Sequence, residues 1–414
     1  MAADKQNKVL NVPTLRFREY TGEWQSCKVG DYGEIITGNT PPTGDHINYA
    51  DGTRLWASPV DLGKTKFVTD TLTKLSSIGF NKTRKLPEGS ILVTCIGSTI
   101  GKMGMAATEM STNQQINSVV VNAQNDKHFV YYALQSRFPR YLTSIAVQAV
   151  PIMSKSSFEK LENYRTTLGE QKKIGFLLNL IDERISAQIR IIEELKSEKK
   201  YLLEQLFCLP NEQSPRLRIK GHTSQWQKVR LSDIVNRIVT RNKNNSSSRV
   251  LTIAAQYGLI DQQEFFHKQI ASSDLSGYYL LKHGDFAYNK SYSGDYPWGA
   301  VKRLDNYPDG VLSTLYICFR PNDDVDSDFL CYYFESTKWY RGIMEISGEG
   351  ARNHGLLNMS VEDYFTTRLR IPIIEEQRDI SKMLNTFSQK IKIEEELLDR
   401  LQKQKAFLLT SMFV

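Results

Sequence analysis

The sequence has few cysteines and lacks the spacings by which cysteine and histidine usually hold metals. Its five cysteines include no C-x-x-C pair, and its six histidines include no H-x-x-x-H spacing. An odd number of scattered cysteines is typical of a reduced, cytoplasmic protein with buried thiols. We therefore predict a cytoplasmic location and no metal site.

Long apolar runs are missing as well. The longest apolar stretches, such as Ile91–Val93, are far shorter than the roughly 20 residues of a membrane-spanning helix. Residues 1–8 contain no apolar segment of the kind that a secretory signal requires. We therefore expect no membrane partner.

Catalytic motifs are incomplete. Gly97–Met103 resembles a nucleotide-binding P-loop, but its glycines are one residue too close, and Met103 replaces the magnesium-binding Ser or Thr. Pro41-Pro42 lacks the flanking residues of an amino-methyltransferase motif, and no G-x-S-x-G is present. We predict no catalytic residues; the Gly97–Met103 turn is either a phosphate contact or a plain tight turn.

What the sequence does contain is a long repeat. The matching segments are Pro13–Arg16 with Pro215–Arg218, Trp24-Gln25 with Trp226-Gln227, Glu170-Gln171 with Glu376-Gln377, and Phe207 with Phe413. A spacing of about 200 residues far exceeds the roughly 20–50 of a solenoid unit. The chain of 414 residues therefore reads as a duplicated domain pair.

Each copy consists of a globular part with short strand-like runs, followed by a long helix. We place the globular parts at 13–160 and 215–366, the helices at 161–208 and 367–414, and a proline-containing linker at 209–214. Below, residues 13–208 are called the first copy and residues 215–414 the second copy.

Both helical segments repeat apolar residues at alternating steps of four and three, a period typical of a coiled coil. The apolar positions are Ile174, Leu178, Ile181, Ile185, Ile192, Leu195, Leu202 and Leu206, and Ile380, Leu384, Phe387, Ile391, Leu398, Leu401, Leu408 and Met412. Polar residues fill the remaining positions of this series, Gln188 and Lys199 in one helix and Glu394 and Lys405 in the other. Two separate core helices are the alternative interpretation.

The polar positions favour an antiparallel pair. A parallel pair would place Lys199 beside Lys405, whereas an antiparallel register can set Lys199 opposite Glu394 and Gln188 opposite Lys405. Polar residues in such a seam commonly determine register. We therefore expect the substitution Lys199→Glu to weaken the pair.

The formal net charge of +7 permits a polyanionic partner. Residues 170–207 carry seven basic and seven acidic side chains, and the second helix is nearly balanced as well, so the surplus positive charge lies in the globular parts and the N-terminal arm. Candidate DNA contacts are loop residues that are basic, amide, hydroxyl or aromatic: Lys82, Arg84, Lys85, Ser98, Lys102, Asn113, Gln114 and Gln115 in the first copy, and Arg241, Lys243, Arg249, Asn289, Lys290, Tyr292, Tyr296, Trp298, Arg352, Asn353 and His354 in the second. For any one of them, a solvated surface role is the alternative.

The chain resembles the DNA-specificity subunits of type I restriction–modification systems over residues 13–413. The segments that carry the resemblance are Leu86–Leu92, Gly97–Lys102, Thr112–Gln115, Gly284–Ser291, Gly310–Tyr316 and Ile371–Arg378. One departure is visible. Pro372 precedes Glu376-Gln377, but Thr166–Gly169 without proline precedes Glu170-Gln171, so the start of the first helix could differ.

The resemblance implies an α+β fold: two similar mixed α/β target-recognition domains separated by two long helices that form an antiparallel coiled coil. It implies a non-catalytic subunit whose domains each read half of a bipartite sequence in double-stranded DNA. The implied partners are two modification (methyltransferase) subunits, which a restriction or translocase subunit can join. S-adenosylmethionine, ATP and Mg²⁺ would be cofactors of those partners, with none in this chain. A stand-alone enzyme acting on nucleic acid and a coiled-coil scaffold without a DNA role are the alternatives.

Overall fold

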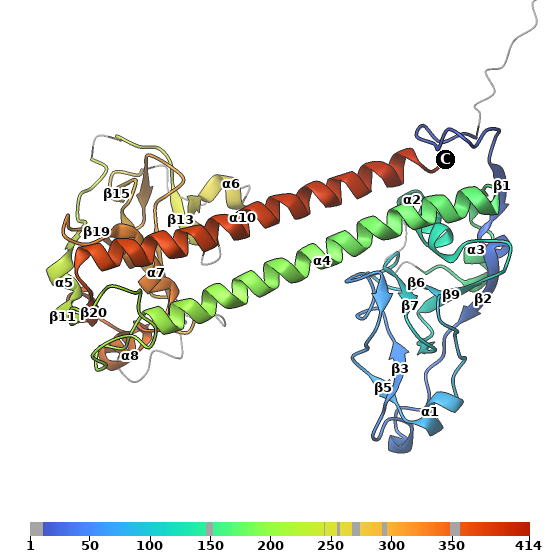
Figure 1. Ribbon diagram of the computed structural model, residues 1–414, viewed down its shortest axis with the longest axis horizontal. Helices are drawn as coiled ribbons and strands as arrows, with labels where there is room; N and C mark the ends of the chain where they lie inside the picture. Colours follow the sequence, from blue (N-terminus) through green and yellow to red (C-terminus); the bar gives the residue numbers. More distant parts are fainter. Residues whose placement is uncertain are drawn as a thin grey trace, which may run out of the picture. The chain divides into compact units, whose positions relative to one another are not determined.

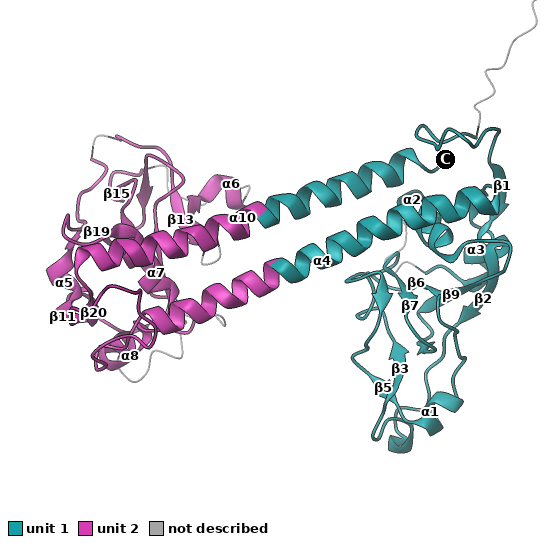
Figure 2. Cartoon of the chain, viewed as in Figure 1, with its two compact units in different colours: residues 1–191, 394–414 teal, residues 192–393 magenta. Residues whose placement is uncertain are grey.

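The computed structural model describes residues 11–145, 152–243, 245–254, 257–266, 274–291, 296–347 and 357–414 (Figure 1). The chain divides into two compact units (Figure 2), residues 1–191 with 394–414 (unit 1) and residues 192–393 (unit 2). Helix α4 (Leu168–Leu206) and helix α10 (Ile374–Ser411) each contribute to both units, because each helix crosses a unit boundary along its length.

Unit 1 contains a mixed globular domain built on a five-stranded sheet of order β2-β9-β6-β7-β4, with a small sheet β5-β3-β8 and a separate pair β1-β10. Besides the long helices, its elements are β1 (Gln25–Lys28), η1 (Val29–Tyr32), β2 (Gly33–Thr37), η2 (His46–Asn48), β3 (Arg54–Ala57), β4 (Phe67–Val68), β5 (Lys74–Leu75), α1 (Ser77–Asn81), β6 (Ile91–Thr94), β7 (Met103–Ala106), β8 (Ser111–Thr112), β9 (Ile116–Val121), α2 (Lys127–Ile145), α3 (Lys155–Glu159) and β10 (Glu162–Arg165). All four residues of β6 are buried, as expected for a central strand with a continuous apolar run.

Unit 2 repeats this plan with a sheet of order β12-β19-β16-β17, a pair β11-β20, and the small pairs β13-β14 and β15-β18. Its elements are β11 (Gln227–Arg230), α5 (Leu231–Ile234), β12 (Val235–Arg237), β13 (Leu251–Ala254), β14 (Gly258–Asp261), α6 (Gln262–Phe266), β15 (Tyr279–Lys282), β16 (Phe286–Asn289), β17 (Ala300–Arg303), β18 (Asp309–Leu312), β19 (Ile317–Pro321), α7 (Ser327–Glu335), α8 (Tyr340–Ile346), α9 (Val361–Thr366) and β20 (Arg368–Ile371). The predicted α+β class with two similar mixed domains and two long helices is confirmed.

The described strands β10 and β20 lie inside the segments that the sequence assigned to the long helices. They pair with β1 and β11, and the helices themselves begin after them, at Leu168 and Ile374. Short helices α3 and α9 precede these strands, and a serine caps each of them: the Ser154 hydroxyl accepts the Ser157 backbone N–H, and the Ser360 hydroxyl accepts the Asp363 backbone N–H. The two copies therefore share a serine-capped short helix and the strand that follows it, in addition to the order of their equivalent strands.

Each hydrophobic core takes its helical residues from both copies. In unit 1, Ile174 and Leu178 of α4 pack with Leu408 of α10 and with Met412 and Phe413, which directly follow that helix. In unit 2, Leu206 of α4 packs with Ile380 and Leu384 of α10. The helix that follows each globular domain therefore begins in the core of its own copy and ends in the core of the other copy.

The repeated Arg and Glu positions form a buried ion pair in each unit. The Glu170 carboxylate, fully buried, accepts from Arg16 Nε at 2.7 Å and Nη2 at 2.9 Å. The buried Glu376 carboxylate accepts from Arg218 Nε at 2.8 Å and Nη2 at 2.8 Å. Planar guanidinium and carboxylate groups fit two parallel hydrogen bonds. These pairs attach the N-terminal segment of each copy to the start of its helix.

The glutamine that follows each of these glutamates closes the helix start in the same way. Gln171 Nε2 donates to the Thr166 carbonyl at 2.8 Å, and Gln377 Nε2 donates to the Pro372 carbonyl at 2.9 Å. Their Oε1 atoms accept the backbone N–H groups of Asp126 and Asp326. The missing proline in the first copy therefore leaves this geometry unchanged.

The long helices run antiparallel, but the predicted register is wrong. In unit 1, Gln188 Nε2 donates to Glu394 Oε2 at 2.6 Å, and Lys405 Nζ lies 2.7 Å from Asp182 Oδ1. Residue numbers on α10 rise as those on α4 fall, which shows the antiparallel direction. Gln188 thus faces Glu394 and not Lys405.

The two lysines are held by tyrosines of the globular domains. Lys405 Nζ lies 5.7 Å from the ring centroid of Tyr132 in unit 1. Lys199 Nζ lies 4.9 Å from that of Tyr332 in unit 2 and 2.8 Å from Glu335 Oε2. A lysine in the apolar series of these helices is thus stabilised by an aromatic face and a carboxylate on a neighbouring helix.

We expect Lys199→Glu to lower the free energy of unfolding of unit 2 by about 1–2 kcal/mol, because it removes a cation–π contact and sets a carboxylate beside Glu335. Urea unfolding monitored by hydrogen exchange measures this change. The double variant Lys199→Glu, Glu335→Lys should recover stability. Recovery by Glu394→Lys in place of Glu335→Lys would instead support the register predicted from sequence.

A buried lysine joins the first domain to helix α4. Lys66, which is 8% exposed, donates from Nζ to Asn179 Oδ1 at 2.6 Å and to Tyr132 Oη at 3.0 Å, and lies 2.8 Å from His128 Nδ1. The Tyr132 hydroxyl in turn donates to Asp182 at 2.6 Å. Burial lowers the pKa of Lys66 to about 7, although the Asp182 carboxylate opposes this shift and the Lys405 ammonium adds to it. Burial, together with the Lys66 ammonium, lowers the pKa of His128 to about 4.

We expect the free energy of unfolding of unit 1 to rise with pH above about 7. Between the folded pKa of Lys66, about 7, and its unfolded value, 10.5, the unfolded chain binds more protons, so raising the pH favours the folded state. The slope contributed by Lys66 is at most about 1.4 kcal/mol per pH unit. Urea unfolding at pH 7, 8 and 9 measures how the free energy of unfolding changes with pH, and Lys66→Met should reduce this slope. Equal slopes in both proteins would contradict the buried, destabilised ammonium.

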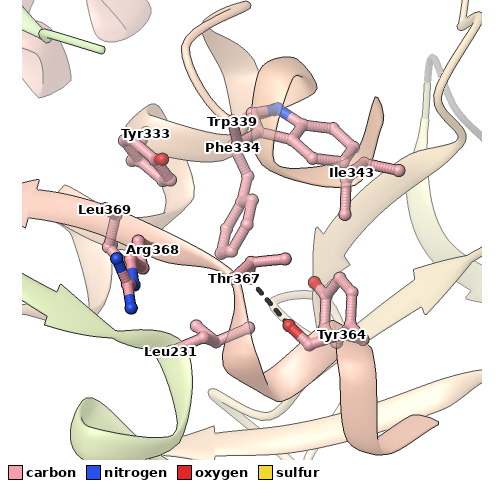
Figure 3. Close-up of a pocket in the computed structure, with 9 residues that line it drawn as sticks. All are labelled: Leu231, Tyr333, Phe334, Trp339, Ile343, Tyr364, Thr367, Arg368 and Leu369. Atoms are coloured by element: carbon pink, nitrogen blue, oxygen red, sulfur yellow. Dashed lines mark hydrogen bonds between the residues drawn. The ribbon is translucent and has the colours of Figure 1, made fainter. Parts of the chain in front are cut away.

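A small cavity inside unit 2 is not a candidate site. It has a volume of about 10 Å³ and is lined by Leu231, Tyr333, Phe334, Trp339, Ile343, Tyr364, Thr367, Arg368 and Leu369 (Figure 3). The dashed line in Figure 3 is the hydrogen bond from the Thr367 hydroxyl to the Tyr364 carbonyl, 2.7 Å. A volume of about 10 Å³ corresponds to roughly one water, so the cavity is a packing defect of an aromatic core.

Candidate nucleic-acid interface

The three loop clusters predicted in the first copy come together at one end of the five-stranded sheet. We call this set the first loop surface, and it comprises residues 37–40, 82–85, 97–102 and 113–115. Each segment begins or ends beside a strand of the sheet or beside helix α1. The sheet therefore positions side chains that lie far apart in the sequence.

Asn39 is the centre of the first loop surface, and the sequence analysis missed it. Its Nδ2 donates to the Lys82 carbonyl at 2.9 Å, and its Oδ1 accepts the Arg84 backbone N–H at 2.9 Å. Its backbone N–H donates to the Thr112 carbonyl at 2.9 Å. Its position in the Gly38–Gly44 run, which is rich in turn residues, was the signal that could have marked it.

The amide residues divide into a structural one and an exposed one. Asn113 is buried and supports the turn: its Nδ2 donates to Gln115 Oε1 at 2.9 Å, and its Oδ1 accepts the Gln115 N–H at 3.1 Å. Gln114 is exposed, and the Thr40 hydroxyl donates to its Oε1. Of these three amides, Gln114 therefore presents its side chain to a partner most directly.

The basic residues of the first loop surface also divide into those that bind other side chains and those that are exposed. Lys82 is engaged by Asn48 Oδ1 at 2.8 Å and Asp45 Oδ2 at 3.2 Å, and Lys85 donates to Asn81 Oδ1 at 3.0 Å. Arg84 is exposed and donates from Nη1 to the Thr37 carbonyl at 2.6 Å, which occupies one of the five N–H donors of its guanidinium. Ser98 and Lys102 are exposed on the 97–102 turn, whose first residue, Gly97, lies beside the Gln115 side chain.

The conformation of the 97–102 turn accounts for the two glycines that make this segment resemble a P-loop. Gly97 and Gly101 have φ values of +97° and +93°, which L side chains rarely adopt. A Cβ at Gly101 would meet the Phe138 ring at 2.8 Å. Both glycines are therefore required by the turn between β6 and β7, whose tip exposes Ser98 and Lys102.

The second copy has a hollow at the equivalent end of its sheet. Its volume is about 260 Å³, and we call its rim the second loop surface: Arg237, Ile238, Tyr279, Asn289, Lys290, Ser291, Thr314, Leu315, Tyr316, Ile317, Cys318 and Val361. Asn289 and Lys290 were predicted. Thr314–Tyr316 were missed, although the repeat frame places them opposite Asn113–Gln115 and could have marked them.

Other candidates of the second copy have structural partners. Arg249 lies over the Tyr307 ring at 4.1 Å and pairs with Asp261 at 2.9 Å. Tyr296 and Trp298 are partly buried and pack against hydrophobic clusters of the domain. Because their aromatic surfaces are already covered in part, these residues are weaker candidates for DNA contact.

Arg241 and Lys243 lie near this surface, although neither lines the hollow. Arg241 stacks on the ring of Tyr279, which does line it, at 4.8 Å, and it donates to the Gly277 carbonyl. Lys243 is exposed. The remaining candidates, Tyr292, Arg352, Asn353 and His354, lie outside the described residues.

Over the ranges that the structure describes, no three or more His, Cys, Asp or Glu side chains gather where they could hold a metal ion. None of the helices in those ranges is both long and apolar enough to cross a membrane.

Known proteins resemble this chain in sequence and in fold. The model of the type I restriction modification DNA specificity domain matches residues 21–197 and again residues 223–403. The type I restriction enzyme MjaVIII specificity subunit of Methanocaldococcus jannaschii is 21% identical over 92% of this chain and 90% of its own length. The HindI specificity subunit of Haemophilus influenzae is 33% identical over 144 residues.

The coverage of these relatives differs. The match to the HindI subunit includes 34% of this chain and only 31% of that protein, and the match to the MjaIX subunit of M. jannaschii includes 42% of each. Among solved structures, the type I restriction-modification S subunit from M. genitalium aligns with a TM-score of 0.56 at 16% identity, over 97% of this chain and 99% of that one. This likeness extends to the fold of almost the whole chain.

Proposed function

Because this chain belongs to the family of type I restriction–modification DNA specificity domains, we propose that it is the specificity subunit of such a complex. It takes no part in catalysis and reads a bipartite sequence in double-stranded DNA. Each domain reads one half, through the first and the second loop surface. S-adenosylmethionine, ATP and Mg²⁺ then belong to partner subunits, two modification subunits and a restriction subunit that can join them.

The observation that carries this proposal is that the two copies have similar sheets but different loops at the ends of the strands. The four strands of the second sheet follow the order of the first four strands of the first sheet, yet the turn before β9 carries three amides and the turn before β19 carries Thr314, Leu315 and Tyr316. Loops that carry function diverge while the scaffold is retained. Two unlike loop surfaces on like scaffolds suit two half-sites of different sequence.

The long helices suit the role of a spacer over the unread gap. Helix α4 has 39 residues, which corresponds to roughly 58 Å at 1.5 Å per residue. One turn of B-DNA is about 34 Å, so a helix pair of this length matches a target with two separated halves. The proposal therefore includes a gap of fixed length between the half-sites.

Sequencing of methylated bases in the host genome tests the bipartite target. The expected result is one motif with two defined halves and a constant gap, which disappears when this gene is deleted. Salt titration of duplex binding by the complex with its modification subunits then tests the contacts. If the logarithm of the binding constant did not change with the logarithm of the salt concentration, a scaffold without a DNA role would be favoured.

Arg84→Ala tests the first loop surface in the same assay. If the guanidinium binds a phosphate, the variant should bind all duplexes more weakly and reduce the salt slope by about one. Lys173→Ala is the matched control, because Lys173 is exposed at the start of α4 and pairs with Glu19. Equal slopes for wild type and Arg84→Ala would remove Arg84 from the interface.

A further inference from the structure

The turn before the second strand in the order of each sheet, β9 or β19, is equivalent in the two copies. Strand β9 lies between β2 and β6, and strand β19 lies between β12 and β16. Both strands begin with a buried isoleucine, Ile116 or Ile317. Counting back from these residues places Leu315 at the position of Gln114.

Leu315 is held in an exposed position by hydrogen bonds of its own turn. Its side chain is 77% exposed. Its backbone N–H donates to the Ser313 hydroxyl at 3.4 Å, and the next N–H, that of Tyr316, donates to the Ser313 carbonyl at 3.2 Å. Tyr316 packs against the hydrophobic cluster beneath, which anchors the turn on the domain.

The hollow beside Leu315 is lined by polar and cationic residues as well as by apolar ones such as Ile238 and Val361, and the Arg237 guanidinium pairs with Glu362 at 3.1 Å. Leu315 shares the rim of the 260 Å³ hollow with Asn289, Lys290 and Arg237. A single exposed leucine is common on protein surfaces and by itself indicates nothing. Leu315 differs because it stands on a hydrogen-bonded turn, among amide and cationic groups, at the place where the other copy presents an amide.

We propose that Leu315 is a specificity-determining residue that recognises thymine in the half-site read by the second copy. In the major groove, thymine alone of the four bases presents a methyl group, and apolar side chains contact it. Gln114 would instead read its half-site by hydrogen bonds, as amides do with adenine. This inference rests on the proposed function and specifies the chemistry of one of its two surfaces.

The test uses the complex of the full chain with its modification subunits and a duplex that carries the methylated motif found in the host. Each thymine of the motif is replaced in turn by deoxyuridine, which lacks only the methyl group. At one position in the half-site of the second copy, binding by wild type should weaken about fourfold, which corresponds to about 0.8 kcal/mol for one buried methylene-sized group. In Leu315→Ala the same replacement should have no effect.

Two further variants separate recognition from damage to the fold. Leu315→Met keeps an apolar end group and should keep the deoxyuridine effect. Leu217→Ala, which truncates another exposed leucine of unit 2, should bind as wild type does. Persistence of every deoxyuridine effect in Leu315→Ala, or no such effect in wild type, overturns the inference while sequence-specific binding stands. Failure of the wild-type complex to prefer any motif overturns the proposed function instead.

Discussion

Glu170→Ala is expected to lower the free energy of unfolding of unit 1 by about 3–5 kcal/mol, because it breaks a buried ion pair and leaves one charge behind. Glu170 is fully buried, and the Arg16 side chain that pairs with it is only 12% exposed. The Arg16 guanidinium would lose two hydrogen bonds, and the Thr166 hydroxyl would lose its carboxylate acceptor. Hydrogen exchange with mass spectrometry locates the loss within the chain.

The second copy supplies a matched variant. Glu376→Ala should destabilise unit 2 toward the lower end of this range, since Arg218 is 22% exposed and keeps more contact with water. It also removes the acceptor of the Trp226 indole N–H, 3.3 Å away. Glu345→Ala, which breaks an exposed pair with Arg341, should cost less than about 1 kcal/mol. If Glu170→Ala lowered the free energy of unfolding as little as Glu345→Ala does, the buried pair would not attach the N-terminal segment.

Phe207→Ala is expected to destabilise unit 2 by about 3–5 kcal/mol, although the residue directly follows the helix of the first copy. Phe207 is 1% exposed, and its ring centroid lies 5.1 Å from that of Phe329 and 5.9 Å from that of Tyr333. Its truncation leaves a cavity among aromatic rings that belong to the second copy. Protection of amides in unit 2 should therefore fall, while protection in unit 1 stays as in wild type.

Phe413→Ala is the reciprocal variant. Phe413 packs against Trp24 at 6.0 Å and Phe129 at 5.5 Å between ring centroids, so its loss should appear in unit 1. Phe176→Ala and Phe407→Ala remove exposed rings from the same two helices and should change stability by less than about 0.5 kcal/mol. Destabilisation of unit 1 by Phe207→Ala would contradict the exchange of helix ends between the copies.

Much of the fold was predictable, because its signals are local. The steps of four and three placed apolar residues such as Ile174 and Leu384 on one face of each helix, and the structure buries them. The repeated Glu-Gln pairs marked the helix starts, although sequence alone did not show that Glu170 and Glu376 bind the repeated arginines. An ion pair between residues 154 or 158 positions apart leaves no periodic trace in a sequence.

The loop surfaces were predictable only in part. Composition marked Arg84, Gln114 and Lys290, which lie on loops, and Asn289, the last residue of β16. It also marked Arg249, whose charge is already paired with Asp261. A single sequence does not distinguish an exposed arginine from a paired one, because the distinction depends on the partner that folding brings to it.

The sequence by itself determined the duplication and the two long helices, since periodicity and repeated motifs are properties of the chain. Their antiparallel direction was predicted correctly, but from a pairing of polar residues that the structure contradicts. Only the tertiary structure decided the partners of the polar seam residues and the core that receives each helix end. Lys199 and Lys405 could satisfy their charge beside a glutamate of the opposite helix or on a tyrosine of a domain. The aromatic face with a neighbouring carboxylate stabilises a partly buried ammonium, and that combination exists only once distant segments have packed.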